Sequence, residues 1–424
     1  MMQQLLQSAS TGLAIGLMSG TSGDGIDAAL VRFTDPPSLG VSGMDVAATN
    51  VSATDGLVSV TGRRATESFI RDVIPHMELI ETHYVPYSME QREQVFRLFR
   101  EDVPVRYVAH MDALMGQWFG EAALALIEKA GVRVGDVSVI GSHGQTVYHA
   151  PHAGVSLQIG HPANIAYISG CPVVSDFRRA DVAKGGQGAP LVPYFDYAYF
   201  RAQDITRVVL NIGGISNITV LPTGATLDDV LAFDTGPGNM LIDALVDTLT
   251  AGTSSFDKDG LLAASGVPRV SVIEKWLAND EYLHRRPPKS TGRERYGVEF
   301  LEPYLKDMAD MSMVDKVATM TRFVAHTVAL GIEMVVHQPF ELVIGGGGRH
   351  NVALVRSIEG LVQPVRTLSP ETHGIPSDMK EAMAFALFAW QFVHGRPTNV
   401  PSATGANGPA LLGQWTPSPL RCDI

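Results

Sequence analysis

Two segments far apart in the chain repeat one hydrophobic pattern. Each is an apolar strand, a turn of small or polar residues and a second apolar strand, reading LAIGLMSGTSGDGIDAALVRF at 13–33 and VLNIGGISNITVL at 209–221. Turns without bulky side chains expose backbone N–H groups, which suits a phosphate chain. Either turn alone is also typical of an ordinary β-hairpin. The pair predicts a nucleotide held from both sides of a cleft between two domains.

Short apolar strands alternate with amphipathic helices along the rest of the chain. Helices are expected near 86–102, 108–130, 162–169, 239–249, 269–278, 318–337 and 377–393, and strands near 41–53, 137–140, 155–159, 172–175, 207–212, 217–221 and 230–233. Ser377 and Asp378 are placed to cap the last helix, and the tail from Gly395 is expected to be loop. This alternation, with a duplicated hairpin, predicts two α/β domains around a central cleft. The expected domains are 1–204 with 375–424, and 205–374.

The composition is typical of a two-domain globular protein and argues against some classes of binding partner. A chain of 424 residues exceeds what one compact core usually holds. Its 44 acidic and 32 basic residues give a net charge of −12 without a basic cluster, which argues against nucleic-acid or membrane partners. Two cysteines, Cys171 and Cys422, cannot form a disulfide framework. With no signal-peptide pattern and no apolar run of membrane-spanning length, a cytoplasmic location is expected.

Two further glycine-rich junctions favour nucleotide binding. In ELVIGGGGRHN at 341–351, an apolar strand runs into four glycines and then a helix, so the backbone can approach a base or ribose. In FDTGPGN at 233–239, Gly236 and Gly238 precede a helix N-terminus that suits phosphate, although a well-capped βα turn would look the same. The chain contains no G-x-x-x-x-G-K-[ST], which excludes a Walker loop.

The densest polar run, SDFRRADVAKGGQGAP at 175–190, carries two candidate catalytic carboxylates. Asp176 directly follows a strand, at the edge of a sheet where α/β proteins place ligands. A kinase acting on a hydroxyl or on water needs a carboxylate close to the nucleophile, and both Asp176 and Asp181 qualify. The alternative is that they pair with Arg178 or Arg179 in a solvated loop. The neighbouring glycines indicate a shaped loop, which favours Asp181.

The run GSHGQTVYHAP at 141–151 begins where another strand ends and offers donors for sugar hydroxyls. His143, Gln145 and His149 are the candidates, and capping or core hydrogen bonds are the alternative for each histidine. No His-x₃-His on a helix and no cysteine pair supports a metal site here. The basic loop PPKSTGRER at 287–295 either reaches into the cleft or lies on the surface.

Together these segments resemble the anhydro-N-acetylmuramic acid kinase family, bacterial cell-wall-recycling enzymes of the sugar-kinase, Hsp70 and actin-like ATPase superfamily. The resemblance covers about 12–415. The matching stretches are GLMSGTSGDGIDAAL, GSHGQTVYHAP, LQIGHPANIA, DFRRADVAKGGQGAPLVP, NIGGISNIT, FDTGPGN, PPKSTGRE and PSDMKEAMAFA. Many dispersed motifs in one order are more specific than any single glycine turn. The chain departs from the family at Gly23, Gly345 and Arg349, which concerns nucleotide affinity rather than the reaction type.

The resemblance implies an α/β, two-domain actin-like or sugar-kinase ATPase fold with a central interdomain cleft. It implies that water attacks C1 of the 1,6-anhydro sugar while O6 takes the γ-phosphate of ATP, giving N-acetylmuramate 6-phosphate and ADP. Asp181 would be the base, with ATP and Mg²⁺ as cofactors and the metal ligands unassigned. The alternatives are a kinase of another amino sugar and a nucleotide-gated, actin-like binding module. A homodimer is expected.

The glycine patterns and the resemblance together give the candidate site residues. Those expected to bind the nucleotide are Gly20, Thr21, Ser22, Gly23, Asp24, Gly25, Ile26, Asp27, Gly213, Gly214, Asn217, Gly236, Gly238, Asn239, Gly346 and Gly347. Those expected to bind the sugar are His143, Gln145, Asp176 and Arg178.

Overall fold

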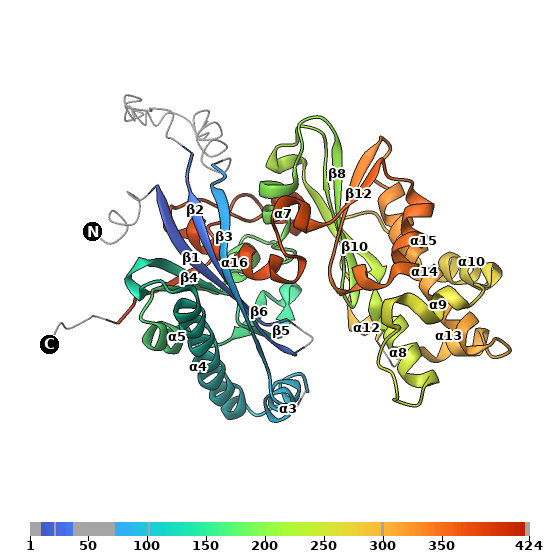
Figure 1. The fold of residues 1–424 in the computed structure, drawn as a ribbon, viewed down its shortest axis with the longest axis horizontal. Coiled ribbons are helices and arrows are strands. Elements are labelled where there is room, and N and C mark those ends of the chain that lie inside the picture. Colours follow the sequence, from blue (N-terminus) through green and yellow to red (C-terminus); the bar gives the residue numbers. More distant parts are fainter. Residues whose placement is uncertain (1–9, 21–22, 37–72, 101, 298–300, 420–424) are drawn as a thin grey trace, which may run out of the picture. The chain divides into compact units, whose positions relative to one another are not determined.

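The computed structural model describes residues 10–20, 23–36, 73–100, 102–297 and 301–419 (Figure 1). The chain divides into two compact units, which are described separately. Unit 1 is Met1–Gly188 with Glu381–Asn399 and Gly408–Ile424, and unit 2 is Ala189–Lys380 with Val400–Asn407. The expected strand at 41–53 lies outside the described residues.

Unit 1 is built on a six-stranded sheet in the order β13-β7-β4-β1-β2-β3. Its strands are β1 (Thr11–Met18), β2 (Gly25–Thr34), β3 (His76–Pro86), β4 (Val137–Ser142), β7 (Val173–Ser175) and β13 (Gln414–Thr416). β1, β4 and β7 run parallel, whereas β1-β2-β3 is an antiparallel meander and β13 is antiparallel to β7. A separate hairpin joins β5 (Gln145–Ala150) to β6 (Val155–Ile159).

Helices in contact with both faces of this sheet complete unit 1. The long α4 (Val105–Ala130) shares a hydrophobic core with β1, as expected from its apolar stripe. On the other face, α16 (Lys380–Val393) approaches the strand backbone so closely that a Cβ on Gly16 would lie 1.7 Å from the carbonyl oxygen of Ala382. Only glycine fits there. The remaining helices are α3 (Met89–Arg97), α5 (Pro162–Ser169) and α6 (Arg179–Ala183).

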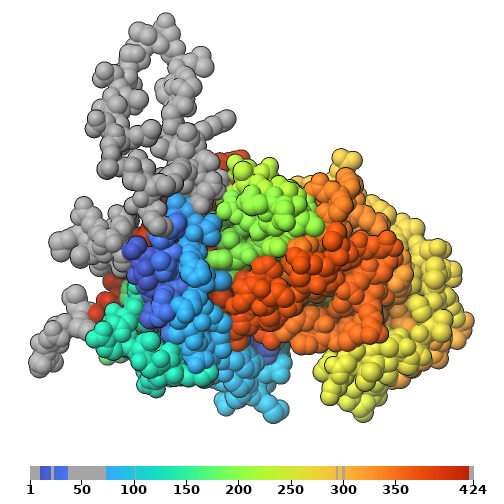
Figure 2. All heavy atoms as spheres, turned by 45° about the horizontal axis from the view of Figure 1, so that its top comes forward, coloured from blue at the N-terminus to red at the C-terminus, as the bar shows by residue number. Residues whose placement is uncertain are grey.

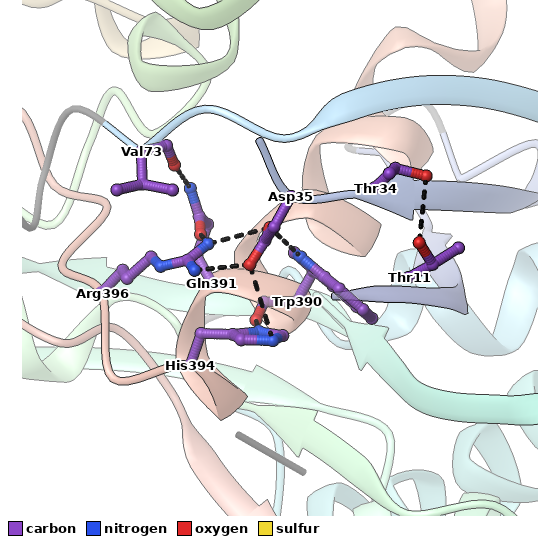
Figure 3. Close-up of polar contacts among 8 residues, drawn as sticks. All are labelled: Thr11, Thr34, Asp35, Val73, Trp390, Gln391, His394 and Arg396. Carbon is purple, nitrogen blue, oxygen red and sulfur yellow. Dashed lines mark hydrogen bonds and ion pairs between the residues drawn. The ribbon is translucent and has the colours of Figure 1, made fainter. Parts of the chain in front are cut away.

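The C-terminal end of α16 is fastened to the end of β2 by a polar cluster around Asp35 (Figure 3). Arg396 donates to both carboxylate oxygens, over 3.0 and 2.5 Å, and Trp390 Nε1 donates to Oδ1 over 3.1 Å. Gln391 Nε2 donates to the backbone oxygen of Val73, just before β3, over 2.9 Å. The cluster therefore joins three segments that are distant in sequence.

Unit 2 repeats the five-strand core of unit 1. Its sheet has the order β10-β9-β8-β11-β12, the same arrangement as β3-β2-β1-β4-β7. The strands are β8 (Thr206–Ile212), β9 (Ile215–Leu221), β10 (Leu231–Pro237), β11 (Phe340–Gly345) and β12 (Arg366–Leu368). As in unit 1, the first three strands form an antiparallel meander and the last two run parallel to the first. The predicted duplication of the hairpin is thus confirmed and extends to the whole sheet.

The helices of unit 2 surround the buried α14 (Met313–Glu333), whose apolar side chains share one core with the sheet. The others are α7 (Pro193–Phe200), α8 (Asn239–Leu249), α9 (Leu261–Ser265), α10 (Val270–Asn279), α11 (Glu281–His284), α12 (Arg293–Tyr296), α13 (Leu301–Asp307), α15 (Val352–Val362) and α17 (Pro401–Thr404). The predicted α/β class with two compact parts is confirmed. The segment 189–204, expected in the first domain, carries α7, which contacts β8 and β9 and groups with unit 2.

Two local expectations are wrong. The helix expected from about residue 86 begins at Met89, because Ser88 and Gln91 make a capping box there, and the strand β3 before it was not predicted. Figure 2 shows β3, in light blue, along the surface of unit 1, which explains why it lacks a long apolar run. The tail is not all loop, because it contains α17 and β13.

Candidate active site

In unit 2, two predicted nucleotide motifs form one backbone surface. Asn239 N donates to the oxygen of Gly213 over 2.8 Å, and Gly238 N donates to the oxygen of Gly214 over 2.9 Å. These bonds join the β8–β9 turn to the N-terminus of α8. A Cβ on Gly238 would lie 2.3 Å from the oxygen of Gly213, so this junction requires glycine. The joined turn and helix N-terminus have the character of an anion-binding site.

The glycine segment after β11 approaches the same point. A Cβ on Gly348 would lie 2.9 Å from Asn239 Oδ1, and one on Gly347 would lie 4.0 Å from Asn239 Nδ2. Gly346 has a φ of +81° and donates from its backbone to Ser377 Oγ over 3.1 Å. Ser377 therefore contacts the glycine segment, while Asp378 forms an ion pair with Arg349.

Two other unit 2 candidates lie within the sheet. Asn217 is part of β9 and pairs with Asn211 and Asp234 on the neighbouring strands. Gly236 lies in β10, where an added Cβ would meet Leu283 at 3.1 Å, in the interior of the unit. Sequence reasoning missed Ser216, whose buried Oγ has no hydrogen-bond partner among the described residues and lies 3.0 Å from the Cβ position of Gly238.

In unit 1, the first glycine turn lies between β1 and β2. Gly23 N donates to the oxygen of Gly20 over 3.1 Å and has a φ of +55°, as expected of a tight turn. Thr21 and Ser22 lie outside the described residues. The next candidates, Gly25, Ile26 and Asp27, lie in β2, with Asp24 just before them. The side chain of Ile26 is buried in the core of unit 1, so only its backbone is available to a ligand.

A cavity of about 330 Å³ lies in unit 1 at the C-terminal ends of β4 and β7. Ligands bind at this edge of a sheet in α/β proteins. The start of α4, the β5–β6 hairpin and the beginning of α6 complete its wall. Its lining residues are Val105, Val108, Ala109, Asp112, Ser142, His143, Gly144, Leu157, Gln158, Ile159, Gly160, Pro162, Ser175, Asp176, Arg179 and Gln414.

His143 lines the cavity as a neutral hydrogen-bond acceptor. Arg178 Nε and Nη2 lie 3.2 and 2.9 Å from His143 Nε2, and His143 Nδ1 lies 2.9 Å from the oxygen of Gly144. Because a guanidinium can only donate, Nε2 accepts and the proton is on Nδ1. Burial, and then the charge of Arg178, lower the pKa of His143 to about 3. Burial also lowers the pKa of Arg178 to about 10, so the arginine stays charged at neutral pH.

Asp176 lines the cavity with a strained backbone. Its φ of +58° lies in the left-handed region, which an aspartate seldom occupies and which is often found at functional sites. Burial raises the pKa of its carboxyl, while the charge of Arg179, whose Nε lies 3.4 Å away, opposes that effect. Asp176 therefore pairs with Arg179, which was one of the alternatives that the sequence left open.

Asp181 is fully buried in α6. Its Oδ2 accepts from the backbone of Gly188 over 2.7 Å, and its Oδ1 accepts from Asn399 Nδ2 over 2.9 Å. Arg178 Nη1 donates to the oxygen of Gly188 over 2.8 Å. Gly188 is therefore held from both sides, by Arg178 at its oxygen and by the carboxylate of Asp181 at its nitrogen. Asp181 does not line the cavity. Sequence reasoning missed Asn399, because it lies in the tail and no local pattern links it to Asp181.

Gln145 is buried beside the first glycine turn rather than in the cavity. Its Oε1 accepts from Ser19 Oγ over 2.9 Å, and Ser19 Oγ accepts in turn from Tyr87 OH over 3.1 Å. This chain links the end of β1 to the start of β5. His149 Nδ1 lies 2.9 Å from Ser156 Oγ, within the β5–β6 hairpin.

Two features are absent from the part of the chain that the structure describes. It contains no group of three or more His, Cys, Asp or Glu side chains suited to a metal ion. None of its helices combines the length and apolar character needed to cross a membrane.

In the basic loop, Lys289 Nζ donates to the oxygen of Leu283 over 3.1 Å.

Comparison with known proteins gives one family over most of the chain. The model of the family described as anhydro-N-acetylmuramic acid kinase matches residues 55–418. A protein of that name from Caldanaerobacter subterraneus is 41% identical, over 95% of this chain and 96% of its own length. Another, from Salinibacter ruber, is 39% identical over 94% of each. A ROK family glucokinase structure from Streptomyces griseus covers 90% of this chain, at 14% identity and a TM-score of 0.36. The predicted resemblance is confirmed, and the chain belongs to the anhydro-N-acetylmuramic acid kinase family.

Proposed function

We propose that this chain opens the 1,6-anhydro ring of anhydro-N-acetylmuramic acid with water and transfers the γ-phosphate of ATP to O6. The products are N-acetylmuramate 6-phosphate and ADP, and the reaction serves the recycling of cell-wall sugars. The observation that carries the proposal is the match to one kinase family over residues 55–418, with 41% identity to a relative of nearly equal length.

The unit 1 cavity is the proposed sugar site. It combines polar side chains, among them Asp176 and the neutral His143, with an apolar wall that includes Val108 and Pro162. Such a mixed lining suits an N-acetylated sugar, which presents hydroxyl groups together with methyl groups and ring carbons. His143 Nε2 is held by Arg178, so the histidine serves to orient Arg178 rather than to carry a proton.

Asp181 is the proposed base that takes a proton from the attacking water. Its hydrogen bonds from Gly188 and Asn399 fix the orientation of both carboxylate oxygens. A fixed orientation is what general-base catalysis requires, because proton transfer depends on short hydrogen-bond distances. Asp181 is fully buried and does not line the cavity, so the proposed step requires a rearrangement that brings the attacking water to its carboxylate.

The glycine junctions are the proposed ATP site. In unit 2, the backbone segments around Gly213, Gly238 and Gly347 meet at the N-terminus of α8. Beside them lies the buried Ser216 Oγ, for which the described part of the chain provides no hydrogen-bond partner. Backbone N–H groups and a helix N-terminus together stabilise phosphate oxygens. Mg²⁺ accompanies ATP and neutralises charge on the transferred phosphoryl group. Because the reaction consumes ATP, we place it in the cytoplasm, and the homodimer stays a prediction.

A coupled ADP-release assay tests the proposal. The substrates are 1,6-anhydro-N-acetylmuramate, N-acetylmuramate and N-acetylglucosamine, each at equal concentration with Mg²⁺ and ATP. We expect turnover of the anhydro sugar alone, with the phosphate on O6. Turnover of an ordinary sugar would instead support a kinase of another amino sugar. ATP binding without turnover of any of the three would support a nucleotide-gated binding module.

A further inference from the structure

The unit 1 cavity, which is the proposed sugar site, holds polar groups to which the proposed function gives no role. Ser142 is 1% exposed, and its Oγ has no hydrogen-bond partner among the described residues. Side chains alternate along β4, and Gly141 faces α16, so Ser142 projects toward the opposite face, where α4 and the cavity lie. Buried polar atoms in native proteins are normally satisfied by protein, water or ligand. The cavity is therefore built to receive polar groups.

Arg179 is the one cation that lines this cavity within the described chain at neutral pH. The other titratable residues of the lining are Asp112, His143 and Asp176. His143 is uncharged, because burial and Arg178 lower its pKa to about 3. Any anionic group of a ligand in the cavity will therefore be attracted to the guanidinium of Arg179.

The guanidinium of Arg179 is oriented with its two terminal nitrogens available. Its Nε donates to the oxygen of Ser156 over 3.2 Å and lies 3.4 Å from Asp176 Oδ2. Neither Nη atom donates a hydrogen bond to any residue that the structure describes. The side chain is 54% exposed, so it can be reached by a ligand. Two parallel N–H groups match the two oxygens of a carboxylate, which a lysine cannot do in the same way.

The two carboxylates of the cavity are held on other partners. Asp112 Oδ1 accepts from the backbone of Gly160 over 2.8 Å, and Asp176 lies on the Nε side of Arg179. The carboxylates of Asp112 and Asp176 repel an anionic group near them. An anion in the cavity is therefore bound best at the Nη edge of Arg179. Val105 and Val108, at the start of α4, supply an apolar surface for methyl groups in the same cavity.

We propose that Arg179 selects the substrate by its carboxylate, binding the lactyl group through which a muramic acid differs from N-acetylglucosamine. This inference rests on the proposed function and adds to it a residue that determines specificity. The pair of nitrogens makes charge-assisted hydrogen bonds to the carboxylate, while the sugar hydroxyls face Asp112 and Asp176.

The test compares two sugars that differ only in that group, 1,6-anhydro-N-acetylmuramate and 1,6-anhydro-N-acetylglucosamine. In Arg179→Met, we expect kcat/KM for the first sugar to fall by about 10- to 100-fold, through KM, because charge-assisted hydrogen bonds are lost. The value for the second sugar stays within about twofold. Arg179→Lys should lose less of kcat/KM than Arg179→Met, because lysine keeps the positive charge but lacks the two parallel N–H groups of a guanidinium. The control is Arg133→Met, a surface arginine paired with Asp136 outside the cavity, which should change neither value.

Each result separates this inference from the proposed function. An equal fall for both sugars would show a structural role, and no change for either would show that Arg179 does not touch the substrate; both contradict the inference while leaving the function intact. Absence of ADP release by the unaltered protein with either sugar would contradict the proposed function, and the inference would fall with it. Melting temperatures of all variants identify any variant that does not fold.

Discussion

Asn399 donates a hydrogen bond from Nδ2 to Asp181 Oδ1 over 2.9 Å, although 218 residues separate them in the sequence. The same amide accepts from the backbone of Ala410 over 2.6 Å and donates to the oxygen of Gly408 over 3.1 Å. Asn399 is thus fixed by the tail before it contacts the carboxylate. The tail therefore contributes to the proposed catalytic geometry, and it does so within unit 1.

The first prediction concerns Asn399 as a positioning residue. Asn399→Ala removes one of the bonds that orient Asp181, and we expect kcat to fall by about tenfold, the value of one hydrogen bond of ~1–1.5 kcal/mol. KM for the sugar and for ATP should stay unchanged, because Asn399 lines neither proposed binding site. Steady-state kinetics with both substrates check this, and Asn279→Ala, at the exposed end of α10, is the control. A rise in either KM with kcat unchanged would contradict the positioning role.

The second prediction concerns the glycine junction of unit 2. Gly238→Ala places a Cβ 2.3 Å from the oxygen of Gly213, which forces the β8–β9 turn away from α8. We expect ATP affinity, measured by calorimetry, to fall at least tenfold while the fold is kept. Gly360→Ala is the matched control, because Gly360 lies in α15 with open space at its Cβ position. That variant should bind ATP normally. Its free energy of unfolding should rise by about 1 kcal/mol, because alanine favours helices more than glycine does. Normal ATP binding by Gly238→Ala would show that the junction does not hold the nucleotide.

The third prediction concerns the pH dependence of stability. Burial of Asp35 raises the pKa of its carboxyl, but the hydrogen bonds from Arg396 and Trp390 lower it by more, so the pKa lies below its usual value. A lowered pKa in the folded state adds stability above the unfolded pKa, and this contribution is lost as the pH falls through the folded value. Asp35→Asn should therefore lower the free energy of unfolding by about 3 kcal/mol at pH 7. The difference between the variant and the unaltered protein should shrink as the pH falls through the folded pKa of Asp35.

Urea unfolding of the full chain at pH 7 and at pH 3 measures both parts of this prediction. Asp136→Asn is a suitable comparison, because Asp136 pairs with Arg133 at the surface. This substitution should hardly change the free energy of unfolding at either pH. A difference between Asp35→Asn and the unaltered protein that stays constant over this pH range would show that the charge of Asp35 does not contribute.

The spacing of apolar residues along the sequence predicted those helices and strands whose hydrophobic periodicity is strong. The two hairpins, α4, α5 and α8 agree with the expected ranges because their apolar spacing and glycine turns are local signals. β3 was missed because it is an edge strand with half-exposed side chains, and its alternation is weak. The duplicated hairpin predicted the pairing of β1 with β2 and of β8 with β9. The rest of the strand order was not predicted, and the pairing of β13 with β7 joins segments that are distant in sequence.

Some of the residues that the sequence singled out lie together in the structure, and their roles in binding and catalysis stay predictions. The sequence identified His143, Asp176 and the glycine junctions, because each directly follows a strand or precedes a helix. It gave no sign of Asn399, whose contact with Asp181 depends on tertiary folding. The neighbouring glycines favoured Asp181 over Asp176, but no local pattern indicated that Asp176 lines the cavity while Asp181 is fully buried.

The central claim is that water opens the anhydro ring while ATP phosphorylates O6. The most direct measurement is turnover of 1,6-anhydro-N-acetylmuramate in ¹⁸O-labelled water, with mass spectrometry and NMR of the products. The account predicts one label on C1 of the sugar, none in the phosphate, and equal amounts of ADP and 6-phosphate. Label in released inorganic phosphate, or a phosphorylated sugar without label at C1, would contradict it.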